Sequence, residues 1–160
     1  CIACNKHVLG VLETVHYRSG RQWNYVRHYP LSTPDDSLSE HVPPEIAQDF
    51  KEAIRCRWIK AFRATVLMCR RSLQVSCDRE EASGKDLFTQ IDDLATKQLI
   101  TGTLKQMAHR IRLLGKSGAH GDYSDIDATI AEADADDAIK FMRHYLDQVF
   151  VFPRQLEEKK

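Results

Sequence analysis

The sequence predicts a mainly α-helical protein, a bundle of about five helices preceded by a small β-hairpin. After residue 44, apolar residues recur at spacings of three and four, as in helices that bury one face. Before residue 30, residues that favour β-strands lie on both sides of Ser19-Gly20, a dipeptide typical of hairpin turns. Four of the five prolines lie between these regions. We therefore expect a hairpin at residues 1–30, a proline-rich linker at 31–44 and a helical bundle at 45–160.

Composition limits the classes of function. With 42% hydrophobic and 29% charged residues, the 160-residue chain is typical of globular proteins, and its zero net charge leaves nucleic-acid binding to a local patch. No apolar run approaches the roughly 20 residues that span a bilayer, so no membrane partner is expected. Five cysteines, an odd number, favour a reducing, cytoplasmic location. Because the chain starts at Cys1 instead of methionine, we expect residues upstream of it.

The N-terminal segment resembles one half of a zinc ribbon. Cys1-Ile-Ala-Cys4 is a CxxC knuckle that leads into the predicted hairpin. The two strands are predicted at His7–Tyr17 and Gln22–Tyr29. A tetrahedral zinc needs two further ligands, from upstream of Cys1 or from His7 or His16. Cys1 and Cys4 are thus candidate ligands of a structural zinc, and the simpler interpretation is two free cysteines at a chain end.

Two helices are predicted directly after the linker. The first begins at Pro43-Pro44-Glu45, with proline and a carboxylate in the first turn. The second spans about Trp58–Val75, and the sequence leaves open whether a break separates it from the first. Its predicted core-facing stripe is Ile59, Phe62, Val66, Cys69 and Leu73. Its other side carries cations with no acid between them: Arg57, Lys60, Arg63, Arg70 and Arg71. Of these, Lys60, Arg63, Arg70 and Arg71 are candidate nucleic-acid-binding residues.

Three further helices complete the predicted bundle. They begin near Asp86, Thr103 and Ala131, and Phe152-Pro153 is expected to close the last one. The fourth helix is expected to end at Leu114 and to break at two glycines, Gly115 and Gly118.

The break after the fourth helix is the candidate site. Lys105, His109, Arg112 and Lys116 share one helical side, and His120 falls on the predicted turn. A histidine beside an arginine and a lysine can bind a phosphate and move a proton near neutral pH. The structural alternatives are a solvated basic face that suits the helix dipole and a His120 that caps the turn. The acidic stretch 122–137 is expected to cap the fifth helix and to neutralise basic side chains of the second or fourth.

Several motifs in order carry a resemblance to a known family. They are Val42-Pro-Pro-Glu-Ile46, Asp49-Phe-Lys-Glu-Ala53, Cys69-Arg-Arg-Ser-Leu73 and Ile111-Arg-Leu-Leu-Gly-Lys-Ser-Gly-Ala-His120, with the CxxC and Tyr29-Pro30. Together they resemble a bacterial family catalogued as a domain of unknown function and grouped with the HEPN superfamily of helical nucleotide-binding and RNase domains. The resemblance runs from about Tyr29 to Pro153.

The resemblance implies a dimerising helical bundle. Many HEPN relatives are metal-independent endoribonucleases of toxin or phage-defence systems, in which an Arg and a His meet their dimer mates across a cleft. By position His120 matches that His, with Arg112 or Lys116 as the cation. The match is incomplete, because Gly115 stands nearest the motif's Arg, Arg112 lies too far before His120, and Gln74 replaces the family's usual Glu.

Two hypotheses from different classes follow. The first is a non-catalytic scaffold, sensor or adaptor, associated with nucleic acid or phage defence. Its nucleic-acid surface would comprise Lys60, Arg63, Arg70, Arg71, Lys105 and His109. The second is an endoribonuclease with His120, Arg112 and Lys116 as catalytic residues, which needs no cofactor for the helical domain.

Overall fold

The computed structural model describes residues 9–17, 20–29, 34–119 and 130–159. The chain divides into two compact units, Cys1–Pro34 and Asp35–Lys160, which are described separately here. No helix within the described ranges is long and apolar enough to cross a bilayer.

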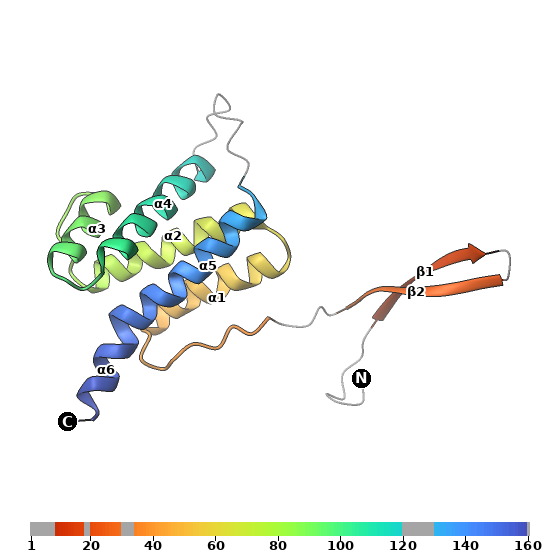
Figure 1. Ribbon diagram of the computed structural model, residues 1–160, viewed down its shortest axis with the longest axis horizontal. Coiled ribbons are helices and arrows are strands. Elements are labelled where there is room, and N and C mark those ends of the chain that lie inside the picture. The colour runs from red at the N-terminus through yellow and green to blue at the C-terminus, as the bar shows by residue number, and fades with distance from the viewer. Residues whose placement is uncertain (1–8, 18–19, 30–33, 120–129, 160) are drawn as a thin grey trace. The chain divides into compact units, whose positions relative to one another are not determined.

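The N-terminal unit is a two-stranded antiparallel hairpin, as predicted (Figure 1). Strand β1, Leu9–Tyr17, pairs with β2, Gly20–Tyr29, in a register that runs from Leu9 opposite Tyr29 to Tyr17 opposite Gly20. One register shift, between Val11 and Leu12, marks a bulge. Cys1 and Cys4 lie outside the described residues, so the zinc ribbon stays a prediction.

The second unit is a helical bundle, and the mainly helical prediction is confirmed (Figure 1). The five main helices are α1 (Pro44–Trp58), α2 (Phe62–Arg79), α3 (Leu87–Thr96), α4 (Gly102–Ala119) and α5 (Glu132–Leu146). Helix α2 contacts α1, α3, α4 and α5, so it is the central element of the bundle. A π-helical turn, η2 (Asp147–Val151), and a short helix, α6 (Phe152–Glu157), continue α5.

The core lies between the apolar faces of these helices. Among its fully buried side chains are Phe50 on α1, Leu73 on α2, Ile91 on α3 and Phe141 on α5. Tyr145 is also fully buried, and its hydroxyl shares a 2.8 Å hydrogen bond with Ser76 Oγ of α2. Because the only polar atom of the tyrosine side chain has a partner, the ring can be buried without an unsatisfied group.

A break separates the first two helices, which the sequence left open. Helix α1 ends in a Schellman motif, with the Ala61 N–H donating to Cys56 O, the Lys60 N–H donating to Arg57 O, and Lys60 at φ +62°. Ile59 is 62% exposed, so its predicted place in the buried stripe is wrong. Val66, Cys69 and Leu73 of the same stripe are fully buried, as predicted.

The last helix does not close at Phe152-Pro153, contrary to the prediction. The α-helix changes into the wider π-helical turn η2, in which the Phe152 N–H donates to Asp147 O five residues earlier. Pro153 then occupies the start of α6, where its missing N–H costs least. The proline therefore reshapes one turn of a longer helix instead of ending it.

Candidate functional site: the ends of α2, α3 and α4

Helix α4 runs without interruption through the expected break. It extends from Gly102 to Ala119, so the prediction that it breaks at Gly115 and Gly118 is wrong. Gly115 is buried against α2, and a Cβ built on it would lie 2.5 Å from Cδ of Arg70. Since real Cβ contacts are never this close, the glycine allows a side chain of α2 to pass over α4. Its role here is helix packing.

The structure describes only part of the predicted catalytic group. His120 lies outside the described residues, and Lys116 is placed within α4 by its backbone. The Arg112 side chain is partly buried on α4. The open turn on which the catalytic prediction placed His120 would have begun at Gly115, and at that position the chain is still helical.

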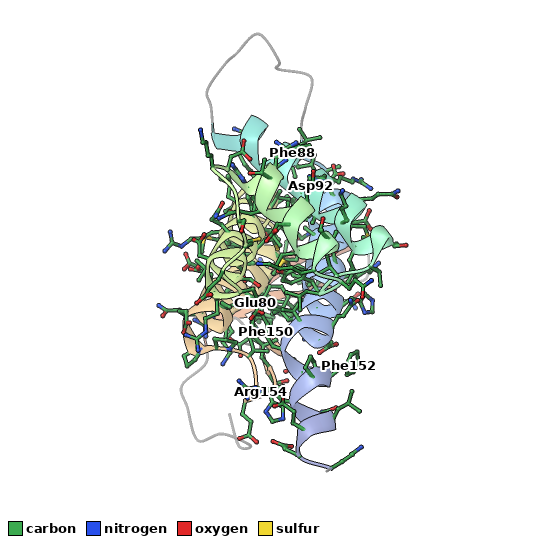
Figure 2. All side chains as sticks on the ribbon, turned by 90° about the vertical axis from the view of Figure 1, so that its left-hand side faces the viewer. Glu80, Phe88, Asp92, Phe150, Phe152 and Arg154 are labelled. Carbon is green, nitrogen blue, oxygen red and sulfur yellow. The ribbon has the colours of Figure 1, made fainter. Side chains whose placement is uncertain are left out.

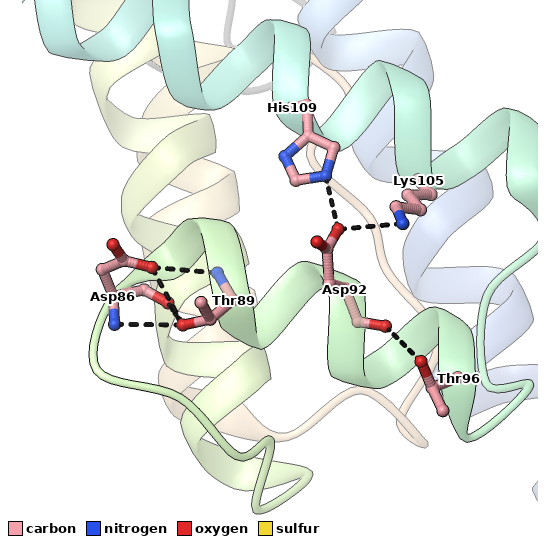
Figure 3. Close-up of polar contacts among 6 residues, drawn as sticks. All are labelled: Asp86, Thr89, Asp92, Thr96, Lys105 and His109. Carbon is pink, nitrogen blue, oxygen red and sulfur yellow. Dashed lines mark hydrogen bonds and ion pairs between the residues drawn. The ribbon is translucent and has the colours of Figure 1, made fainter.

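Lys105 and His109 of α4, which were predicted to bind nucleic acid, both contact a carboxylate on α3 (Figure 3). Asp92 Oδ1 lies 2.9 Å from His109 Nε2 and 3.0 Å from Lys105 Nζ. Hydrogen bonds from Lys105 and then His109 hold the pKa of Asp92 below its ordinary value, so this carboxylate is ionised near neutral pH. The charge of Lys105 is therefore balanced by Asp92 of α3. From the sequence, the acidic stretch 122–137 was expected to neutralise this helix.

Arg112 lies on the other side of His109 and has an aromatic partner. Its guanidinium carbon is 5.2 Å from the centroid of the Phe88 ring on α3, and the His109 ring centroid is 4.8 Å from the same ring. Figure 2 shows Phe88 and Asp92 together on this side of the helical unit. Within the described part of the chain Arg112 forms no ion pair.

Asp86 begins α3 beside this group. Its carboxylate accepts the Thr89 N–H, and the Thr89 hydroxyl lies 3.4 Å from the Asp86 N–H, which completes a capping box (Figure 3). The hydrogen bonds of Thr89 lower the pKa of Asp86, and the charge of Arg112 adds a smaller effect. The cap therefore fixes the start of α3, and with it the position of Phe88 two residues later.

The acidic residues at the start of α5 pair with one arginine of α1 and, as predicted for the fourth helix, with one arginine of α4. Arg57 Nε donates to Asp136 at 2.6 Å, and its Nη2 donates to Glu132 at 2.7 Å. Arg110 of α4 pairs with Asp134 at 2.9 Å and with Asp137 at 3.5 Å. Asp134 also accepts the Ala131 N–H, so the segment caps α5. Asp122, Asp125 and Asp127 lie outside the described residues.

The predicted cations of α2 and of the turn before it fall into two groups. Arg71 pairs with Asp49 of α1 at 3.0 Å. Lys60, Arg63 and Arg70 form no ion pair with any residue that the structure describes. Arg63 and Arg70 are seven residues apart, so they share one face of α2 at a separation of about 10 Å along the axis. The Arg70 side chain reaches Gly115 of α4, one turn from Arg112.

Sequence reasoning missed two residues of this region, Phe88 and Asp92. Both lie on one face of α3, four residues apart, and neither belongs to a recognisable motif. Among the described residues no three His, Cys, Asp or Glu side chains are placed to hold a metal ion. Burial raises the pKa of Cys77 to about 12 and that of Cys69 further, so neither buried thiol is a nucleophile at neutral pH.

Comparison with known proteins adds the family. A family model described as a domain of unknown function, DUF4145, matches residues 51–160. The chain belongs to the DUF4145 family. The DUF4145 match begins within α1 and includes α2 to α6, so it covers Phe88, Asp92 and Arg112 and leaves the hairpin outside. No curated protein and no solved structure matches the chain.

Proposed function

We propose that this DUF4145 domain is a HEPN-like, dimerising module of a bacterial protein that binds RNA without cleaving it. It would serve as a scaffold, sensor or adaptor, for instance in phage defence. The HEPN part of the proposal and the dimer rest on the ordered motifs in the sequence. The RNA-binding part rests on the arrangement of charges on the helical unit.

One observation carries the RNA-binding proposal. Among the described helices, Arg63, Arg70, Arg112 and Arg143 form no ion pair, and of these Arg143 donates to the Asp35 carbonyl. Arg55, Arg57, Arg71 and Arg110 each bind a carboxylate. Arg63, Arg70 and Arg112 come from the N-terminal half of α2 and the C-terminal half of α4, which meet where Arg70 lies on Gly115. A phosphate backbone is attracted by such a group in any base sequence, because the attraction is electrostatic.

The beginning of α2 supports the same ligand. No side chain caps this helix, its first turn contains no acid, and Arg63 lies in that first turn. Free backbone N–H groups and a cation together favour an anion at a helix N-terminus. A packing role alone offers no reason for a cation at this end of the helix dipole.

The cleavage alternative is the second candidate, and it rests on His120, which lies outside the described residues. Its geometry needed a turn at Gly115 that would bring His120 out beside Arg112, and α4 is helical there. His109 is the described histidine nearest to Arg112 in the chain, and Asp92 binds its Nε2. We therefore propose binding, with RNA cleavage as an outcome that the experiment must detect.

The test is binding of a short, fluorescein-labelled single-stranded RNA at low ionic strength, followed by anisotropy. We expect the wild-type protein to bind and the triple variant Arg63→Gln/Arg70→Gln/Arg112→Gln to lose at least about tenfold in affinity. The matched control, Arg55→Gln/Arg71→Gln/Arg110→Gln, removes the same charge from ion-paired positions and should change affinity much less. Circular dichroism should show that both variants remain folded.

Three outcomes would overturn the proposal. They are no binding by the wild-type protein, equal losses in the two triple variants, and RNA cleaved to products with a 2′,3′-cyclic phosphate end. The last outcome, if abolished by His120→Ala, would establish the endoribonuclease instead.

A further inference from the structure

Phe88 is an exposed aromatic residue that packing of α3 does not explain. Helix α3 buries Leu87, Gln90, Ile91 and Leu94, and Phe88 lies off that face with 44% of its surface exposed. A single exposed ring is common on protein surfaces, so any further role must be indicated by the groups around it.

The ring is held in place from the α4 side only. The His109 imidazole is tilted by 33° against it, and the Arg112 guanidinium lies over it at 5.2 Å. Since His109 and Arg112 are three residues apart on one helix, both approach Phe88 from α4. With the guanidinium over the ring, 44% of the Phe88 surface is exposed, which places an accessible aromatic group beside a cation.

Two buried polar atoms of this group have no partner. His109 Nδ1 and Arg112 Nε are out of contact with solvent and make no hydrogen bond. Because Asp92 is ionised and can only accept, His109 Nε2 carries the hydrogen of that pair and Nδ1 is left unused. Buried groups of this kind cost free energy.

We propose that Phe88 stacks with one base of a single-stranded RNA whose neighbouring phosphate binds Arg112. This inference rests on the proposed RNA binding and names the form of RNA. Aromatic stacking combined with a cationic path for the backbone is how proteins bind single strands without reading their sequence. Arg112 joins the ring to Arg70 and Arg63, which would follow the strand along α2.

Stacking predicts a preference that charge alone does not. In a duplex the bases are already stacked on one another, so they are unavailable to Phe88. A strand of abasic ribose phosphates keeps the charge and lacks the rings. Wild-type protein should therefore bind single-stranded RNA more tightly than either a duplex of the same length or the abasic strand.

The decisive variant is Phe88→Leu, with Phe152→Leu as its matched control. Phe152 is 55% exposed on α6, and Figure 2 shows it far from Phe88 on the helical unit. We expect Phe88→Leu to weaken single-strand binding by roughly tenfold, while its binding of the abasic strand is unchanged. Phe152→Leu should bind like wild type, and Phe88→Trp should keep or improve the affinity.

The failures of the two proposals are distinguishable. Stacking is overturned, and RNA binding stands, if wild type binds all three ligands equally and Phe88→Leu has no effect. Stacking is also overturned if Phe88→Leu leaves RNA binding intact but disrupts self-association, because the ring would then be a protein contact. If wild type binds none of the three ligands at low ionic strength, RNA binding itself fails.

Discussion

Gly115 of α4 lies beneath the side chain of Arg70 of α2. A Cβ at Gly115 would be 2.5 Å from Cδ, 3.1 Å from Cβ and 3.3 Å from Cγ of Arg70. The contact joins the helix that carries Arg63 to the helix that carries Arg112, so the missing side chain at position 115 determines how closely two parts of the proposed RNA surface approach each other.

We expect Gly115→Ala to destabilise the domain despite the better helix propensity of alanine. Alanine would gain about 0.5–1 kcal/mol within a helix, whereas overpacking a close contact costs about 1–3 kcal/mol. The predicted net loss is about 1 kcal/mol in the free energy of unfolding, measured by urea denaturation. Gly102→Ala is the control, because no atom lies within 4 Å of a Cβ built there. In an Arg70→Ala background, Gly115→Ala should become neutral or stabilising.

Arg57→Lys is predicted to destabilise the bundle although it preserves charge. Arg57 reaches Asp136 with two nitrogens, at 2.6 and 3.1 Å, while Nη2 also binds Glu132. A lysine cannot reproduce this fork, and the expected loss is about 1 kcal/mol. Arg55→Lys, at a 64% exposed side chain, should change stability by less than about 0.5 kcal/mol. Equal effects of the two substitutions in thermal unfolding would contradict this expectation.

The buried thiol of Cys77 predicts a loss of stability at high pH. Burial raises its pKa from 9.0 to about 12, so between these values the unfolded chain releases the proton while the folded chain keeps it. The folded state binds more protons there, and the free energy of unfolding must fall as pH rises. In Cys77→Ser, whose hydroxyl does not titrate, the decline above about pH 9 should be smaller. Urea unfolding at a series of pH values measures the difference.

Asp92 predicts the opposite trend in acid. Its pKa is lowered mainly by hydrogen bonds from Lys105 and His109, so its stabilising effect is present above the ordinary pKa of 3.8 and is lost as pH falls through the folded value. The difference in stability between wild type and Asp92→Asn should shrink as the solution is acidified. A difference that stays constant with pH, or one unaffected by Lys105→Gln, would show that Asp92 acts without its charge.

Local patterns predicted the helices well because burial follows the helical period. Val66, Cys69 and Leu73 are buried as their spacing indicates. The helix ends were harder to predict, because three Schellman motifs use residues other than glycine. Lys60, Glu81 and Gln98 all have positive φ, a conformation that sequence rules assign to glycine or asparagine. Conversely, Gly115 led to the wrong prediction of a helix break. The glycine is needed for its contact with Arg70, which lies forty-five residues earlier in the chain and cannot be inferred from the neighbouring sequence.

The candidate site was predictable as a set of residue types but not as a set of free charges. The sequence grouped Lys105, His109 and Arg112 on one side of a helix, and the structure retains that side. The sequence could not indicate that Asp92 binds Lys105 and His109, or that Arg112 instead lies over the ring of Phe88. These assignments depend on how α3 packs on α4, and the sequence contains no local signal for that geometry.

Salt dependence of RNA binding distinguishes a surface built from these three arginines from non-specific attraction. The logarithm of the binding constant for single strands falls with the logarithm of salt concentration by about 0.7 per phosphate neutralised. If Arg63, Arg70 and Arg112 each bind one phosphate, the Gln triple variant should have a slope less negative than wild type by about 2. The Arg55/Arg71/Arg110 variant should keep the wild-type slope. A slope unchanged in the first variant would contradict the assignment of these arginines to RNA.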